Sequence, residues 1–287
     1  MRRPITWLDV FTSVPLTGNQ LAVVHDADGL ADATMLAFAR ETRLSETTFV
    51  QTPTAAGADY RNRIFALPDE MPFAGHPSLG TAVAVARVRE EGRARYVQQT
   101  HAGLQPVDVD LDGDRARASM LQEPPAFGAL PKPADALAAA GLHGRDGDPQ
   151  REPQVVSTGL AHLLVPVRDV RALADAAPNR AAMRALLEPL GATVLYLAAI
   201  DADAGVARAR GFFVVPGGVT EDPATGSAAG PLLAYLRERG GADELVVEQG
   251  VEIERASTIS CTWSGDRPRV SGDVVVVGDG HVRLDGG

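Results

Sequence analysis

Hydrophobic and polar residues alternate along many short stretches of this chain, which is the pattern of strands with one buried face. In the first half, alternating or β-rich stretches predict strands at residues 5–11, 20–25, 46–51, 60–66, 96–100, 106–111 and 116–121. In the second half they predict strands at residues 154–157, 162–167, 193–198, 208–215, 246–254, 258–263, 269–271 and 274–277. Each half is therefore expected to be rich in short strands.

Helical periodicity is confined to a few segments. Residues 32–43 place Met35, Phe38 and Ala39 on one face behind Asp32, which we expect to be the N-cap. A second amphipathic helix is expected at residues 179–190, and a small-residue helix at residues 228–239.

The segment after Gly75 is apolar or small on every side until Arg87, which is typical of a helix enclosed by other structure. Pro77 suits its first turn and Gly92 suits its C-terminal stop. Strands that alternate with so few helices do not match the βαβ order of a dinucleotide-binding fold.

One motif occurs twice. The pattern Arg-x-Arg-x-Phe followed by Glu-x-Pro-x-x-Gly spans residues 61–75 and again residues 208–226. Each copy predicts a strand, a turn and the start of a small-residue helix, so the chain is expected to consist of two like halves. Two helix N-termini, each with unpaired N–H groups, could together bind a carboxylate.

The Pro-rich and Gly/Asp-rich stretches at 124–133 and 141–149 indicate the crossing between the halves and a surface loop. We therefore expect one domain at residues 1–120, with the extreme C-terminal strand packing back on it. The second domain is expected at residues 121–287.

The two copies of the motif differ in polar residues, and these are candidates for chemistry. His76 aligns with Ser227, and Asp222 replaces Met71. A histidine at a helix start can transfer protons, although His76 could simply cap the helix. Asp222 is also common before a helix, but its departure from the repeat favours a function, whereas Ser227 has the position of an anion binder and is ordinary in a first helical turn. Glu46, at a strand entrance, reads from composition alone as a solvated residue.

Composition excludes several classes of protein. The chain has 287 residues, 45% of them hydrophobic and 22% charged, as in globular proteins, and it contains no apolar run long enough to span a membrane. A net charge of −10 disfavours nucleic acid as a partner. No secretion signal is evident, so a cytoplasmic location is expected.

The sequence supports neither a cofactor nor a metal. Lys132, the only lysine, lies between prolines and is poorly placed for a Schiff base. The glycine-rich segments lack nucleotide-binding spacing, and the six histidines lack metal-ligand spacing. The only cysteine, Cys261, lies in an expected strand and is interpreted as a buried structural thiol.

Four blocks in order resemble the PhzF family of phenazine biosynthesis proteins. They are DVFTSVPLTGNQLAVV at 9–24, LSETTFV at 44–50, PFAGHP at 72–77 and EDPATGSA at 221–228. The stretches at 226–232 and 249–253 also look like those of the family's phenazine-pathway isomerase.

The resemblance implies an α+β, diaminopimelate-epimerase-like fold. Such a fold has two similar domains, each a β-barrel wrapped around a central helix, with the active site in the cleft between them, and such proteins are usually homodimers. Epimerases of this fold use a cysteine from each half. Here the matching turns hold Gly75 and Gly226, so the resemblance implies chemistry by carboxylate and imidazole instead.

The family's catalytic residues fall on Glu46, His76 and Asp222. Its substrate-binding positions fall on Ser45, Gly75, Gly226 and Ser227. The implied reaction is a cofactor-free isomerisation of trans-2,3-dihydro-3-hydroxyanthranilate in phenazine-type antibiotic biosynthesis, in which Glu46 moves a proton from C3 to C1.

Two other functions stay open at this point. The chain could be an isomerase or epimerase for another small amino or hydroxy acid, because the machinery requires only an acidic C–H group beside an anchored carboxylate. It could also be a non-catalytic protein of the same fold that binds a small molecule or a partner.

Overall fold

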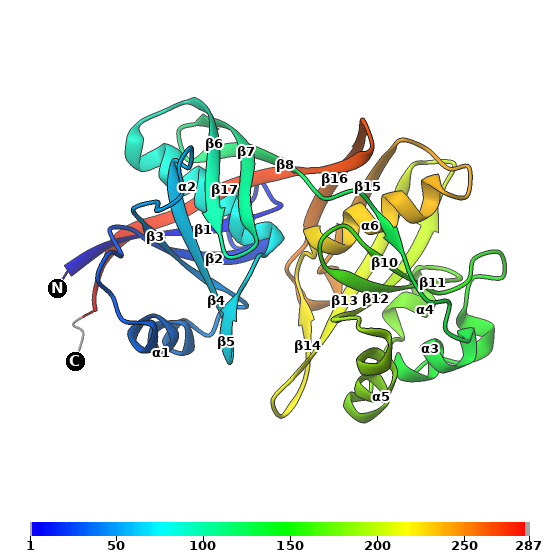
Figure 1. Cartoon of the computed structure of the whole chain (residues 1–287). Coiled ribbons are helices and arrows are strands. Elements are labelled where there is room, and N and C mark those ends of the chain that lie inside the picture. Colours follow the sequence, from blue (N-terminus) through cyan, green and yellow to red (C-terminus); the bar gives the residue numbers. More distant parts are fainter. Residues whose placement is uncertain (1, 285–287) are drawn as a thin grey trace. The chain divides into compact units, whose positions relative to one another are not determined.

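The computed structural model describes residues 2–284, and its internal contacts divide the chain into two compact units (Figure 1). Unit 1 comprises residues 2–120 together with 271–284, and unit 2 comprises residues 121–270. The end of the chain therefore belongs to the unit formed by its beginning.

Eight strands of unit 1 form a closed ring. They are β1 (Arg2–Val10), β2 (Asn19–Val24), β3 (Thr47–Gln51), β4 (Tyr60–Ala66), β6 (Arg93–Thr100), β7 (Gly103–Asp112), β8 (Arg115–Leu121) and β17 (Arg267–Arg283). Each pairs with the next in that order, and β17 pairs with both β8 and β1. The pairs β2–β3 and β4–β6 are parallel. A short strand, β5 (Asp69–Met71), forms a hairpin with β4.

Helix α2 (Gly75–Arg89) contacts six strands of this ring, namely β1, β2, β3, β4, β6 and β7. Its residues 76–86 are all buried, which confirms the prediction of an enclosed helix. The predicted stop at Gly92 is wrong, because the chain already leaves the helix at Glu90, whose φ is 57°.

Helix α1 (Asp32–Thr42) packs with Met35 and Ala39 in the core cluster that includes Phe49 and Phe65. The predicted N-cap is wrong by one residue. Ala31 is the N-cap, and no side chain caps this end of the helix. Asp32 accepts a hydrogen bond from Arg63 of β4 at 2.8 Å, so its carboxylate is used by another element.

Unit 2 repeats the strand order of unit 1. Its strands are β9 (Ala126–Phe127), β10 (Gln154–Ser157), β11 (Ala161–Val167), β12 (Val194–Asp201), β13 (Val206–Val215), β14 (Gly218–Asp222), β15 (Glu244–Gln249) and β16 (Ser257–Ser264). The pairs β11–β12 and β13–β15 are parallel, as β2–β3 and β4–β6 are, and the β13–β14 hairpin matches β4–β5. The repeat seen in the sequence is therefore a repeat of topology.

Helix α6 (Gly226–Arg237) corresponds to α2 and contacts β10, β11, β15 and β16. The structure also contains elements that the sequence did not predict. Helix α3 (Pro133–Ala139) begins at the last residue of the first stretch expected to be irregular and continues beyond it, and the 3₁₀ turn η1 (Gly144–Asp146) lies within the second stretch. Leu137 of α3 joins a core cluster with Met183 of helix α5 (Arg180–Leu190), so burial orders this segment.

The strand expected at residues 246–254 ends at Gln249. Gly250 has a φ of 76°, and a Cβ there would lie 2.4 Å from the carbonyl oxygen of Arg255, so the chain makes a tight turn into η2 (Val251–Ile253). Unit 2 also holds the short helix α4 (Val170–Ala174). The two strands expected at 269–271 and 274–277 are parts of the single strand β17.

Candidate active site

Glu46 and His76 lie together in unit 1. Glu46 immediately precedes β3, and His76 is the second residue of α2, which contacts β3 inside the ring. The Nε2 atom of His76 lies 3.5 Å from Oε2 of Glu46. The side chains are 5% and 17% exposed, respectively, so an acid and a base are paired where little water can reach them.

Burial raises the pKa of the Glu46 carboxyl group, and a hydrogen bond with Ser45 opposes that shift. Its buried Oε2 atom has no hydrogen-bond partner among the residues that the structure describes. A carboxyl group with a raised pKa can be deprotonated and reprotonated near neutral pH, as a general acid/base must be.

Asn19 connects the other polar groups of this cluster. Its Nδ2 atom lies 3.1 Å from Nδ1 of His76, and its Oδ1 atom accepts a hydrogen bond from the hydroxyl of Ser45 at 3.3 Å. Asn19 is 1% exposed and begins β2, the parallel neighbour of β3. Reasoning from the sequence missed Asn19, although it lies in one of the blocks that resemble the PhzF family.

Gly75 provides the first residue of α2. The N-cap of this helix, Ala74, makes no side-chain cap hydrogen bond, and no acidic residue lies in the first turn. Such an end retains backbone N–H groups and a positive dipole, both suited to an anionic oxygen.

Asp222 lies at the end of β14 in unit 2 and is 9% exposed. The hydroxyl of Thr225 donates to its Oδ2 atom at 2.8 Å, and the side-chain amide of Gln249 donates to its backbone carbonyl at 2.8 Å. Gln249 also accepts a hydrogen bond from the buried hydroxyl of Tyr196 at 3.0 Å. A fixed network therefore holds the orientation of the Asp222 carboxylate.

Gly226 and Ser227 open helix α6, whose N-cap likewise makes no side-chain cap hydrogen bond. The Nε2 atom of His162, on β11, lies 2.9 Å from the hydroxyl oxygen of the half-buried Ser227. His162 is fully buried, and burial lowers its pKa to about 4. Its contact with Ser227 was not anticipated, since no sequence spacing links the two residues.

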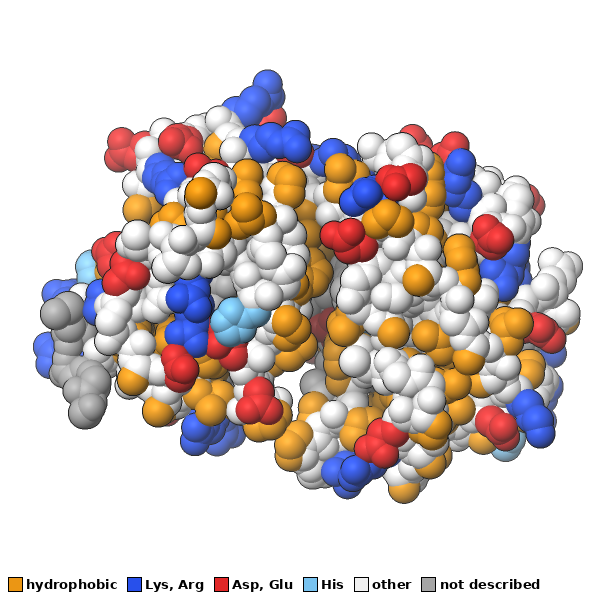
Figure 2. Space-filling view, viewed as in Figure 1, with side chains coloured by type: hydrophobic (Ala, Val, Ile, Leu, Met, Phe, Trp, Pro, Cys, Tyr) orange, Lys and Arg blue, Asp and Glu red, His pale blue; other side chains and the backbone are white. Residues whose placement is uncertain are grey.

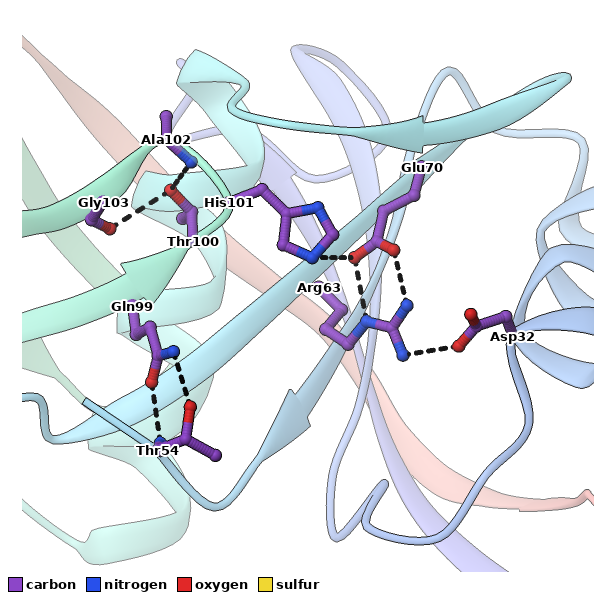
Figure 3. A network of polar contacts seen from close by, with 9 residues as sticks. All are labelled: Asp32, Thr54, Arg63, Glu70, Gln99, Thr100, His101, Ala102 and Gly103. Atoms are coloured by element: carbon purple, nitrogen blue, oxygen red, sulfur yellow. Dashed lines mark hydrogen bonds and ion pairs between the residues drawn. The ribbon is translucent and has the colours of Figure 1, made fainter.

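The residues shared by the two motif copies make structural contacts. Arg63 binds Glu70 through two hydrogen bonds and also reaches Asp32, while His101 lies 3.6 Å from Glu70 (Figure 3). In unit 2, Arg210 binds Glu221 through two hydrogen bonds and donates to three backbone carbonyls.

In both copies the guanidinium also lies over the ring of the phenylalanine two residues later. The shared arginine and glutamate thus hold each hairpin in place. The polar residues that differ between the copies are left as the candidates for chemistry.

The candidate residues fall into two groups. Ser45, Glu46, Gly75 and His76 gather in unit 1 around the starts of β3 and α2, whereas Asp222, Gly226 and Ser227 gather in unit 2 at the start of α6. Cys261 belongs to neither group. It is buried in β16, and burial raises the pKa of its thiol, which is the environment of an inert cysteine.

Residues 2–284 contain neither a metal-binding cluster nor a membrane-spanning helix. Within residues 2–284, no three His, Cys, Asp or Glu side chains are grouped so that they could hold a metal ion. No helix in that range is long and apolar enough to cross a membrane. On the visible faces, positive and negative side chains are interspersed (Figure 2).

The amino-acid sequence of this chain is similar to those of known proteins. The family profile described as "Phenazine biosynthesis-like protein" matches residues 8–280. A trans-2,3-dihydro-3-hydroxyanthranilate isomerase from Pseudomonas aeruginosa is 36% identical over 285 residues, covering 97% of this chain and 96% of the relative. The enzyme of the same name from Pseudomonas fluorescens is also 36% identical, covering 96% and 98%.

Solved structures agree with the sequence matches. A "Predicted Epimerase" from Pseudomonas aeruginosa is 35% identical with a TM-score of 0.86, covering 99% of this chain and 100% of that one. A PhzF-family protein from Bacillus anthracis is 27% identical with a TM-score of 0.85 and the same coverage. A hydroxyproline epimerase from Agrobacterium vitis is 16% identical with a TM-score of 0.68, covering 99% and 93%, which shows that this epimerase shares the fold.

Proposed function

Because this chain belongs to the PhzF family and is an isomerase, we propose that it moves a proton between two carbons of trans-2,3-dihydro-3-hydroxyanthranilate. The names of the relatives from two Pseudomonas species support this choice of substrate. The observation that carries the chemistry is Glu46, a buried carboxylate with a raised pKa, 3.5 Å from an imidazole nitrogen.

The proposed reaction uses Glu46 as both base and acid. Its ionised carboxylate removes the proton from C3, the double bonds of the ring shift, and the same carboxyl group delivers a proton to C1. The product then tautomerises to a ketone. Atoms and electrons balance without a cofactor, because one C–H bond breaks while another forms.

His76 and Asp222 are proposed to hold the polar groups of the substrate and to relay protons at oxygen or nitrogen. Ser45 and Ser227 are proposed to bind the substrate, together with the uncapped N-termini of α2 and α6 at Gly75 and Gly226. A carboxylate bound at such an N-terminus would be held close to unpaired backbone N–H groups.

A second candidate function is epimerisation or isomerisation of another small amino or hydroxy acid. The structural similarity, at 35% identity, to the Pseudomonas aeruginosa protein described as a "Predicted Epimerase" favours it. A reaction through two cysteine thiols does not fit the sequence, because Cys261 is the only cysteine and lies buried in β16. In this candidate function as well, Glu46 and His76 would move the proton.

The test is to incubate the purified protein with trans-2,3-dihydro-3-hydroxyanthranilate in D₂O and to follow the reaction by NMR and mass spectrometry. The proposal predicts loss of the substrate and hydrogen or deuterium newly bound at C1. An unchanged substrate, with deuterium exchanged into a different small acid from a panel, would reject this substrate and support the second candidate. No exchange into any acid that binds would support a binding role.

A further inference from the structure

Asn19 is a buried side chain that touches both His76 and Ser45, the residue next to Glu46. It is 1% exposed, with Nδ2 at 3.1 Å from Nδ1 of His76 and Oδ1 at 3.3 Å from the hydroxyl of Ser45. A primary amide has a fixed polarity, because its nitrogen only donates and its oxygen only accepts. The contact with His76 therefore indicates which nitrogen of the imidazole carries the proton.

The backbone before Asn19 fixes the position of this amide. Gly18 has a φ of 70°, and a Cβ there would lie 2.4 Å from Cγ2 of Thr12 and 2.6 Å from the carbonyl oxygen of Val10. Asn19 itself is paired with Val10 across the β1–β2 ladder. Only glycine fits this approach, so the loop delivers Asn19 into the start of β2 in one position.

The hydrogen bonds of Asn19 define the tautomer of His76. With Nδ2 as the donor, Nδ1 of the imidazole must accept, and a neutral imidazole then carries its proton on Nε2. That Nε2 atom lies 3.5 Å from Oε2 of Glu46. In this tautomer an N–H group lies beside the carboxylate, where its positive end favours the ionised form; the other tautomer would place a lone pair there.

We propose that Asn19 is a positioning residue that holds His76 as the Nε2–H tautomer and so places an N–H group beside the Glu46 carboxylate. The catalytic consequence rests on the proposed function, in which ionised Glu46 is the base. The tautomer itself is a property of unit 1 and does not depend on any substrate.

The first measurement is the tautomer of His76 in the protein labelled with ¹⁵N-histidine, read from two-bond ¹⁵N–¹H correlations at about pH 8. The signals of His76 are assigned by their absence in His76→Gln. The proposal predicts an unprotonated Nδ1 and a protonated Nε2 in the wild-type protein. A protonated Nδ1 would overturn it, because the amide would then face His76 with its oxygen.

The Asn19→Asp variant provides the second test, since it keeps the size of the side chain and removes the donor. A carboxylate there can only accept a hydrogen bond, so it favours the tautomer in which Nδ1 is protonated and donates to it. Asn62→Asp is the matched control, since Asn62 is 3% exposed in the same unit and donates to Gln98 instead. In that control the His76 signals should keep the wild-type pattern.

Kinetic measurements distinguish a positioning role of Asn19 from a role in substrate binding. Asn19→Asp should lower kcat by about tenfold or more, because His76 no longer supports the base, while KM changes by less than about threefold. A normal kcat in a variant with a switched tautomer would overturn the catalytic part of the proposal. If the wild-type protein turns over no substrate, the proposed function fails, and the NMR result still decides the tautomer.

Discussion

At the scale of single residues, the burial of Glu46 suits proton transfer but lowers the stability of the fold. Its carboxyl group is buried enough to raise its pKa above the ordinary value of 4.5. Such a group stabilises the folded state fully below its ordinary pKa, and this contribution is lost as the pH rises through the raised value. Ionised Glu46 therefore lowers the free energy of unfolding at neutral pH.

This gives a prediction for Glu46→Gln, which keeps the size of the side chain and removes the titration. The variant should gain stability relative to wild type between pH 5 and pH 8, by up to about 1.4 kcal/mol for each unit by which the pKa is raised above 5. Chemical denaturation at both pH values measures this difference. A difference that stays constant with pH would mean that Glu46 titrates normally in the folded protein.

His162 predicts the opposite pH dependence. Burial lowers its pKa to about 4, so its contribution to stability is present above the ordinary value of 6.5 and is lost as the pH falls towards 4. Relative to His162→Gln, the wild-type protein should lose about 2 kcal/mol between pH 7 and pH 5. Equal losses in the two proteins would show that His162 is not held neutral beside Ser227.

At the scale of elements, the duplicated motif builds two equivalent hairpins. Arg63 with Glu70 braces β4 against β5, and Arg210 with Glu221 braces β13 against β14. Arg210 is 8% exposed and also serves the carbonyls of residues 173, 174 and 176. Lysine has one ammonium group and cannot replace this planar array of donors.

Arg210→Lys should therefore lower the free energy of unfolding by about 2 kcal/mol or more, because buried acceptors lose their donors. Arg208→Lys is the matched control two residues away. The Arg208 side chain is 24% exposed, and its ion pairs are longer, at 3.5 and 3.6 Å. Arg208→Lys should therefore lower the free energy of unfolding by less than about 1 kcal/mol. Comparable urea midpoints for the two variants would contradict a bracing role for Arg210.

Most elements could be predicted from the sequence where one local signal decided them. The alternation in β15 and the apolar or small residues on every side of α2 are such signals, and both elements are present. Interactions over a long sequence distance were harder to predict. Asp32 was mistaken for a cap because its partner, Arg63, lies 31 residues away, and α3 was not predicted because its core partners lie on α5.

The candidate site shows the same limit. The repeat exposed His76, Asp222 and Ser227, whereas Glu46 was found only through the resemblance to the PhzF family. Asn19 and His162 were not identified from the sequence, because each is noticed only through its contact with a distant residue. The partner of Asn19 is 57 positions away in the chain, and that of His162 is 65 positions away. Residue type and local spacing do not reveal such pairs.

At the scale of the whole molecule, one strand order is used twice within a single chain, and a fold shared with epimerases is combined with a lone buried cysteine. Membership of the PhzF family identifies the chain as an isomerase. The proposed account replaces a pair of thiols by one carboxylate in unit 1, supported by His76 and Asn19. Its central claim is that Glu46 transfers the proton.

The most direct test of that claim is the rate at which Glu46→Gln converts trans-2,3-dihydro-3-hydroxyanthranilate in D₂O, compared with wild type. Glu41→Gln, at an exposed glutamate of α1, is the control and should react at the wild-type rate. The account predicts that Glu46→Gln still binds the substrate and loses about 100-fold or more in kcat, with no deuterium entering C1. A kcat within about tenfold of wild type would show that another group moves the proton.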